Sequence, residues 1–195
     1  MAFTEPELLD AWTRINGDGA PGSLADLIIQ AAVRHDIAPE VFVALCNEET
    51  NDTDELGDGG HGVGPCQIDD RSWEIAQVAK ATGLCWTDPA PLLDCGANLL
   101  ARNKSQAKGR YPLLAADLIL RIALSGYNCG MGNAFAGHEA GDCDKYTANG
   151  HYGEEILAKA EVFRPWVLAH IAHHSELLEV TGAPAPYPGM TSNYV

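Results

Sequence analysis

The sequence predicts a mainly α-helical fold with at most a small β-hairpin, and three observations support this prediction. Hydrophobic residues make up 46% of the 195 residues, which is enough for one packed core. Apolar residues recur three and four positions apart in several segments, as they do on one face of a helix. Strand-like alternation is scarce, and no internal repeat divides the chain. We therefore expect one folded domain over residues 23–182, an N-terminal extension over 1–22 and a proline-rich tail over 183–195.

The first helices can be placed by their end signals. A short helix is expected before a turn rich in glycine at residues 16–22. Ser23 is a plausible N-cap for a second helix, which ends at residues 35–36. Pro39 suits the first turn of a third helix, expected over about 39–50.

Residues 51–64 contain five glycines and four acidic residues and are expected to form a loop. A loop of this length inside a compact domain is more often functional than a short one. It follows the helix that ends with two adjacent glutamates, Glu48 and Glu49. Helical periodicity alone does not choose between them, and both could simply solvate the helix end.

The second half of the chain is also expected to be helical. Helices are predicted over 70–82, 94–108 and 113–125, with turns at 88–91 and 126–132. The helix over 113–125 is strongly apolar and is expected to be buried. A last long helix should begin near Tyr152 and be kinked or split at Pro165.

The net charge and the lengths of the apolar runs argue against nucleic acid and membrane as partners. The chain has 12 basic and 27 acidic residues, a net charge of −15, so a nucleic-acid backbone is not an expected partner. No apolar run approaches the roughly 20 residues of a membrane-spanning helix. The N-terminus lacks the apolar stretch of a secretory signal. We expect neither membrane insertion nor a signal peptide.

The six cysteines include no CxxC pair, so a structural zinc site of the usual spacing is not expected. Cys85 with Cys95, and Cys129 with Cys143, could each close a disulfide across a short segment. Without a signal peptide, reduced thiols are favoured for both pairs.

Three histidines on the last helix have a spacing that can bind a metal. His170, His173 and His174 lie at positions i, i+3 and i+4. No acid or cysteine set completes such a site, so a packing or surface role is favoured. We expect no metal and no cofactor.

Four local motifs follow one another in a fixed order. They are Glu49-Thr50 at the end of a helix, Gly57-Asp58 in the loop, GPCQID at 64–69 and GYNCG at 126–130. Their order and spacing resemble those of the goose-type lysozymes and the related soluble lytic transglycosylases, over residues 24–165. That family has a Glu-Ser at a helix end, a Gly-x-x-Gln turn and an Ala-Tyr-Asn-x-Gly turn. The resemblance implies a lysozyme-like α+β fold with helices around a glycan-binding cleft.

The resemblance also implies roles for single residues. Glu49 matches the catalytic glutamate of the family, because Thr50 then stands where the family has serine. Glu48 would break that register. Asp58 and Asp69 match the two aspartates that goose-type lysozymes present across the cleft. These three carboxyl groups are the expected catalytic residues.

The implied substrate-binding residues are Gln67, Tyr127, Asn128 and Tyr152. The first three fall on cleft-lining positions of the family. Tyr152 falls on a late tyrosine that points at the catalytic glutamate. The chain departs from the family at several motif positions: Thr50 replaces serine, Pro65-Cys66 replaces Leu-Met, and Gly126 and Cys129 replace alanines. These departures leave the catalytic acid intact but concern the sugar-subsite contacts and the shape of the cleft.

The expected activity is that of a glycoside hydrolase, a muramidase that cleaves the β-1,4 bond between MurNAc and GlcNAc in bacterial peptidoglycan. Glu49 would protonate the leaving oxygen, and a second carboxylate would activate water, which gives inversion. Asp58 and Asp69 are both candidates for that carboxylate. The alternatives are a lytic transglycosylase, which forms 1,6-anhydroMurNAc ends, and a non-catalytic glycan-binding or virion structural protein.

The expected setting is a bacteriophage. A single-domain muramidase without a signal peptide suits an endolysin released from the host cytoplasm during lysis, or a virion component that opens the cell wall. Peptidoglycan is the expected partner, joined by other virion proteins in the second case. The charge of −15 predicts weak long-range attraction to anionic walls and little inhibition by salt.

Overall fold

The structure, a computed structural model, describes residues 4–17, 22–50, 56–85 and 87–181. Within these ranges the chain forms eight α-helices, one 3-10 helix and one antiparallel hairpin. This confirms the mainly α class with a small hairpin. No helix in the described ranges is long and apolar enough to cross a membrane. The expected proline-rich tail over 183–195 lies outside them.

The first helix belongs to the main core. Helix α1 (Glu5–Asn16) begins with a capping box in which the Thr4 backbone N–H donates to the Glu7 carboxylate at 2.8 Å. Its apolar face, which includes Leu8 and Trp12, is buried in the same cluster as the central helices. The expected N-terminal extension thus contributes a packed helix to the domain.

Helices α2 (Leu24–Arg34) and α3 (Pro39–Thr50) follow the predicted end signals. Ser23 Oγ accepts a hydrogen bond from the backbone N–H of Asp26, which confirms Ser23 as the N-cap of α2. Every residue of α3 from 39 to 47 is buried. This helix therefore runs through the core and carries its last turn, with both glutamates, to the edge of the core.

The end of the expected loop over 51–64 forms the first strand of the small hairpin. After the 3-10 helix η1 (Asp58–Gly60), strand β1 (Gly62–Val63) pairs with β2 (Ile68–Asp69) through a turn over 64–67. Residues 51–55 lie outside the described ranges. Helix α4 (Glu74–Thr82) follows and packs on β1.

Two later boundaries differ from the prediction. Helix α5 (Ala90–Arg110) begins within the predicted turn at 88–91, because a proline such as Pro91 is compatible with the first turn of a helix. Helix α6 (Ala116–Cys129) runs through the first four residues of the predicted turn at 126–132, so the start of that turn was wrong, while a turn is present at Gly130.

Gly126 explains the error in α6. A Cβ atom at Gly126 would lie 2.2 Å from Met131 Sδ and 3.4 Å from Met131 Cα, so this glycine lies inside the helix at a close contact with Met131 and does not form a turn. The chain turns only at Gly130, whose φ is +82°. A helix that was not predicted, α7 (Met131–Glu139), starts directly afterwards.

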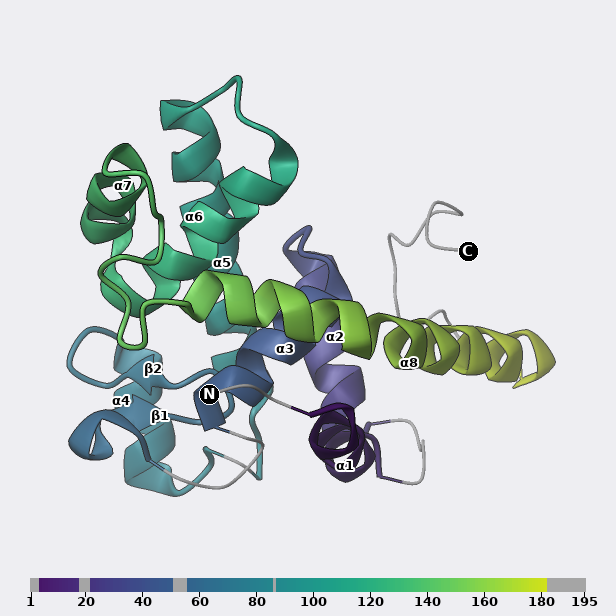
Figure 1. Cartoon of the computed structure of the whole chain (residues 1–195). Helices are drawn as coiled ribbons and strands as arrows, with labels where there is room; N and C mark the ends of the chain where they lie inside the picture. Colours follow the sequence, from purple (N-terminus) through teal and green to yellow (C-terminus); the bar gives the residue numbers. More distant parts are fainter. Residues whose placement is uncertain (1–3, 18–21, 51–55, 86, 182–195) are drawn as a thin grey trace.

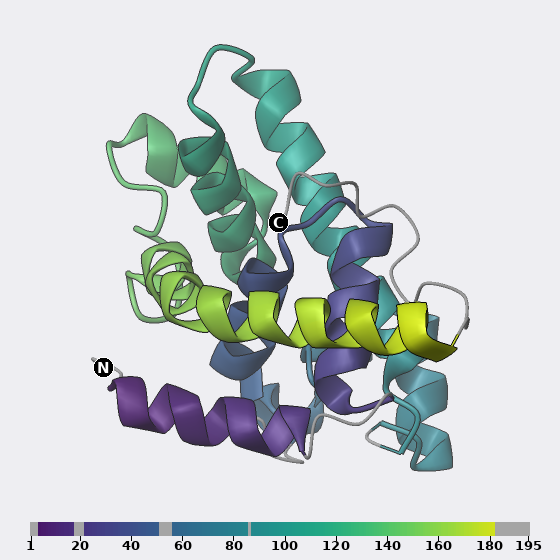
Figure 2. The ribbon, with the colours of Figure 1, turned by 90° about the vertical axis from the view of Figure 1, so that its right-hand side faces the viewer.

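Helix α8 (Tyr152–Thr181) begins at the predicted residue and continues through Pro165 without being split. It crosses the helices of the core in Figure 1 and packs against α1, α3 and α6. Figure 2, turned by 90°, shows α1 below α8 and the hairpin region behind them. Through these contacts α8 holds the end of α3 and the end of α6 in one region of the molecule.

One of the three predicted histidines has a packing role. His170 Nε2 lies 2.8 Å from Asp26 Oδ1, and the two side chains are only 3% and 2% exposed. The imidazole also meets the Trp12 ring edge to face at 5.8 Å. The His173 side chain is exposed, and the His174 side chain lies outside the described part.

We expect His170→Ala to lower the free energy of unfolding by about 2–4 kcal/mol, or the melting temperature by roughly 5–15 °C. The substitution removes one partner of a buried carboxylate and leaves a cavity beside Trp12. Thermal unfolding of the wild type, His170→Ala and the exposed His173→Ala measures this. Equal effects of the two substitutions would show that the buried pair adds no stability.

Candidate active site

A cavity of about 550 Å³ opens between the end of α3, the hairpin and the end of α6. It is lined by ten residues: Glu49, Gly57, Asp58, Gly62, Gln67, Asp69, Arg71, Tyr127, Asn128 and Ala148. Six of the seven residues predicted as catalytic or substrate-binding are among them. The seventh, Tyr152, contacts Glu49 directly.

The structure distinguishes the two adjacent glutamates. Glu48 turns to α8, where its carboxylate forms an ion pair with Lys159 Nζ at 2.7 Å. Glu49 lines the cavity and accepts a hydrogen bond from the Tyr152 hydroxyl. Tyr152 and Lys159 are seven residues apart on the same helix and so project from one face. Helix α8 therefore contacts both glutamates but leaves only Glu49 at the cavity.

Burial dominates the acidity of Glu49. It raises the pKa of this carboxyl to about 7, because the charged form loses water at the end of a buried helix. The hydrogen bond from Tyr152 acts in the opposite direction, and the nearby charge of Glu48 raises the pKa further. At neutral pH a substantial fraction of Glu49 therefore carries its proton.

Tyr152 is well placed to orient this carboxyl. Its side chain is 4% exposed, and burial together with the neighbouring Glu49 raises the pKa of the phenol well above its usual value. The hydroxyl therefore keeps its proton and donates it in the hydrogen bond. The predicted contact between the late tyrosine and the acid is present.

Across the cavity, Arg71 bridges the two aspartates. Its Nε and Nη2 lie 2.9 and 3.2 Å from the two carboxylate oxygens of Asp69, and Nη2 also forms an ion pair with Asp58. The hydrogen bonds from Arg71 hold the pKa of Asp69 below its usual value. Asp69 is thus ionised under conditions in which Glu49 is protonated.

Gln67 lines the cavity and also forms two side-chain hydrogen bonds that connect backbone segments in and beside the hairpin. Its side-chain oxygen accepts from the Gly57 backbone N–H at 2.7 Å, and its amide donates to the Gly64 carbonyl at 3.1 Å. Cβ atoms at Gly57 and Gly62 would lie 2.2 and 2.1 Å from that oxygen. The absence of side chains at Gly57 and Gly62 therefore leaves space for the Gln67 side chain.

The residues predicted at the end of α6 hold neighbouring segments. The Tyr127 hydroxyl donates to the Cys66 carbonyl at 2.9 Å, which fixes the turn that carries Gln67. Asn128 Oδ1 accepts from the Ala148 backbone N–H at 2.9 Å. The α6 end thus connects the hairpin to the segment before α8.

The thiols near the site pack in the core. Cys46 and Cys66 are buried, and their Sγ atoms lie 3.6 Å apart between α3 and the hairpin. All six cysteines lie in the described ranges and none forms a disulfide, including Cys85 with Cys95 and Cys129 with Cys143. No cluster of three metal-binding side chains was found among the described residues.

Gly62, Arg71 and Ala148 line the cavity but were not predicted as site residues, although Arg71-Ser72 continues the family resemblance after Asp69. Arg71 is the basic residue nearest in sequence to Asp69, and this proximity was a signal that could have identified it. Ala148 lies in an irregular segment whose position depends on Asn128, twenty residues earlier, so no local signal marks it.

Comparison with known proteins assigns no family. No model of a known protein family matches the chain. The chain is 28% identical, over 144 residues, to a protein of Lottia gigantea described as a glycine, glutamate and proline-rich protein. The matched residues cover 70% of this chain and 33% of that protein, so the chain spans about a third of the length of this curated relative.

Proposed function

We propose that the protein is a muramidase that hydrolyses the β-1,4 bond between MurNAc and GlcNAc in bacterial peptidoglycan. The observation that carries this proposal is the partly buried Glu49 carboxyl, which has a pKa of about 7 and faces Asp58 and Asp69 in one cavity. Glycoside hydrolysis needs a protonated acid on one side of the scissile bond and an ionised carboxylate on the other. Glu49 and the aspartates supply this pair.

In this reaction Glu49 protonates the oxygen of the leaving GlcNAc. A water held by Asp58 or Asp69 attacks the anomeric carbon of MurNAc from the opposite face and gives inversion. Arg71 keeps the two aspartates together on that side of the cavity. The Tyr152 hydroxyl orients Glu49.

The arrangement of elements supports a lysozyme-like architecture. A helix that ends in the acid, a 3-10 helix and a short hairpin that carry the two aspartates, and a helical bundle around the cavity are the parts that such a fold requires. The peptidoglycan partner and a role in a phage lysis enzyme or virion are part of the same proposal.

The pKa of Glu49 predicts the alkaline limit of activity. Because the general acid must carry its proton, kcat/KM should fall by about tenfold for each pH unit well above 7. Initial rates on purified peptidoglycan at constant ionic strength measure this profile. A rate that stayed constant to pH 9 would contradict Glu49 as the acid.

A lytic transglycosylase is the second candidate, because both aspartates are engaged by Arg71. If neither carboxylate can activate water, the 6-hydroxyl of MurNAc attacks in its place. Mass spectrometry of the digested wall decides between the reactions. Reducing MurNAc ends support hydrolysis, 1,6-anhydroMurNAc ends support the transglycosylase, and no turnover would contradict both.

A further inference from the structure

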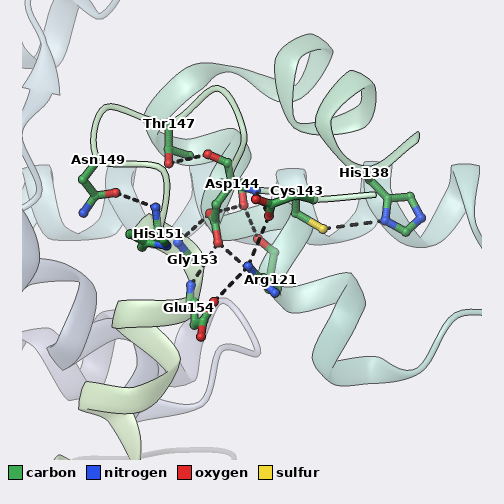
Figure 3. A network of polar contacts seen from close by, with 11 residues as sticks. Arg121, His138, Cys143, Asp144, Thr147, Asn149, His151, Gly153 and Glu154 are labelled. Atoms are coloured by element: carbon green, nitrogen blue, oxygen red, sulfur yellow. Dashed lines mark hydrogen bonds and ion pairs between the residues drawn. The ribbon is translucent and has the colours of Figure 1, made fainter. Parts of the chain in front are cut away.

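The Asp144 carboxylate is 0% exposed and lies at the centre of the network in Figure 3. Its Oδ1 accepts from Ser125 Oγ at 2.7 Å and from the Gly153 backbone N–H at 2.8 Å. Its Oδ2 accepts from Arg121 Nε at 3.0 Å and from the Glu154 backbone N–H at 3.2 Å. A carboxylate offers about four acceptor positions, and here four donors use them.

Two of these donors belong to the first turn of α8. Gly153 and Glu154 are the second and third residues of the helix, whose N–H groups have no partner within the helix. Asp144 satisfies both and places a negative charge at the positive end of the helix dipole. It therefore caps α8 from eight residues upstream of Tyr152.

Gly153 shows how tightly this turn is held. A Cβ atom at this position would lie 3.0 Å from Asp144 Oδ1, 3.0 Å from the Arg121 carbonyl oxygen and 3.1 Å from Ser125 Oγ. These distances are shorter than most real Cβ contacts. The absence of a side chain at Gly153 lets α8 approach both the carboxylate and α6.

The other two donors belong to α6, the helix that carries Tyr127 and Asn128 into the cavity. Asp144 thus connects α6 with the first residues of α8. Tyr152 is the first residue of α8, and its hydroxyl donates to Glu49. Asp144 is therefore linked to Glu49 through the first turn of α8 and the side chain of Tyr152.

We propose that Asp144 is a positioning residue, which holds the first turn of α8 against α6 and so keeps the Tyr152 hydroxyl on Glu49. Its importance for catalysis rests on the proposed function, whereas the contact between Tyr152 and Glu49 can be tested without any activity.

Asp144→Asn is the most direct variant. Asparagine has the same shape, but its amide NH2 would face an obligate donor in either orientation. At the Oδ1 position it meets the Gly153 N–H, and at the Oδ2 position it meets Arg121 Nε and the Glu154 N–H. The first turn of α8 should therefore move and weaken the Tyr152 hydrogen bond. Since that bond lowers the pKa of Glu49, its loss should raise this pKa.

The direction of the change in the pKa of Glu49 distinguishes a displaced Tyr152 from the mere loss of a negative charge. Removing a negative charge at residue 144 would by itself favour ionised Glu49 and lower its pKa. A rise therefore requires a change in the hydrogen bond. The other titratable or charged groups near Glu49 are unchanged in the variant: Glu48, Tyr127, Asp58, Asp69 and Arg71.

The test is a ¹³C NMR titration of the Glu49 carboxyl, assigned with Glu49→Gln. We expect Asp144→Asn to raise the pKa of Glu49 by about 0.5–1 unit, in the same direction as Tyr152→Phe. Once Tyr152 is phenylalanine, Asp144→Asn should add little, because both act through one hydrogen bond. Glu154→Gln is the matched control, because it removes the same charge from an exposed partner of Arg121. It should not raise the pKa.

Activity provides a second readout. On purified peptidoglycan, Asp144→Asn should lower kcat by about 10–100-fold with little change in KM, and should move the alkaline limb to higher pH. If the wild type has no activity, the proposed function fails while the titration still tests Asp144. A lower melting temperature with an unchanged or lowered pKa of Glu49 would overturn the positioning role.

A second variant covers the case in which Asp144→Asn does not fold. Gly153→Ala leaves every charge in place but forces the turn away from Asp144 and α6 by a few tenths of an ångström. It should raise the pKa of Glu49 by a smaller amount. An unchanged pKa in folded Gly153→Ala would contradict the proposal.

Discussion

Replacing Glu49 by glutamine should abolish cleavage of the cell wall, with a loss in kcat of about 10³-fold. Glutamine keeps the shape of the side chain and can still accept the hydrogen bond from Tyr152, but it has no proton to give to the leaving oxygen. The release of reducing ends from purified peptidoglycan measures the loss. Binding to intact wall should persist, because the cavity keeps its shape.

Glu48→Gln is the matched control for this substitution. Glu48 is the adjacent residue, but its carboxylate pairs with Lys159 on α8 instead of lining the cavity. We expect Glu48→Gln to retain most of the activity. Equal losses from the two substitutions would show that the end of α3, and not the acid, is being tested.

Glu49→Gln should also be more stable than the wild type in alkaline solution. The pKa of Glu49 is about 7 in the folded chain and lies near 4.5 when unfolded, so the wild type loses stability as pH rises from about 4.5 to about 7 and does not regain it above 7. Glutamine has no such penalty, and above pH 8 the variant should gain up to about 3 kcal/mol. Urea unfolding at pH 5 and pH 9 measures this. Lower stability at pH 9 would show that the loss of activity reflects a damaged fold.

The sequence alone could not distinguish Glu49 from Glu48 by its helical pattern. Helical periodicity could not separate two adjacent residues at a helix end, and only the register with Thr50 favoured Glu49. The physical reason lies on α8, more than a hundred residues away. Lys159 pairs with Glu48, and Tyr152 donates a hydrogen bond to Glu49. No local pattern in the sequence predicts these contacts between distant segments.

Helix boundaries were predicted well where a local signal controls them. Ser23 caps α2, and Pro39 begins α3. The prediction failed at Gly126, because glycine can serve a turn or a close contact and the sequence does not say which. Helix α7 was missed because Met131–Glu139 is short, contains two glycines and has little apolar periodicity.

The candidate site was predicted as a set of residues but not as a set of contacts. Asp58 and Asp69 were expected at the cleft, yet their bridge through Arg71 depends on how the hairpin folds back on itself. Asp144 was not singled out, since an acidic residue in an irregular segment looks like any solvated residue in the sequence. Its burial arises only when α6 and α8 meet.

The hydrogen bonds of the two aspartates now favour one of them as the base. Asp69 accepts from the Arg71 backbone N–H and from Arg71 Nε on Oδ1, and from Arg71 Nη2 and Ser72 Oγ on Oδ2. These four donors use its acceptor capacity. Among the described residues, Asp58 accepts only from Arg71 Nη2, through Oδ2, and its side chain is 68% exposed against 38% for Asp69.

Asp58→Asn should therefore lower kcat by about 10²–10³-fold, because a base needs an unoccupied oxygen to take a proton from water. Asp69→Asn should lower kcat less, by about tenfold, through a displaced Arg71. In Asp58→Ala, added azide should restore cleavage, since azide needs no base to attack the anomeric carbon while Glu49 still protonates the leaving oxygen. The expected product is a glycosyl azide of inverted configuration. A larger loss in Asp69→Asn would assign the water to Asp69, and full activity in both variants would favour attack by the 6-hydroxyl of MurNAc.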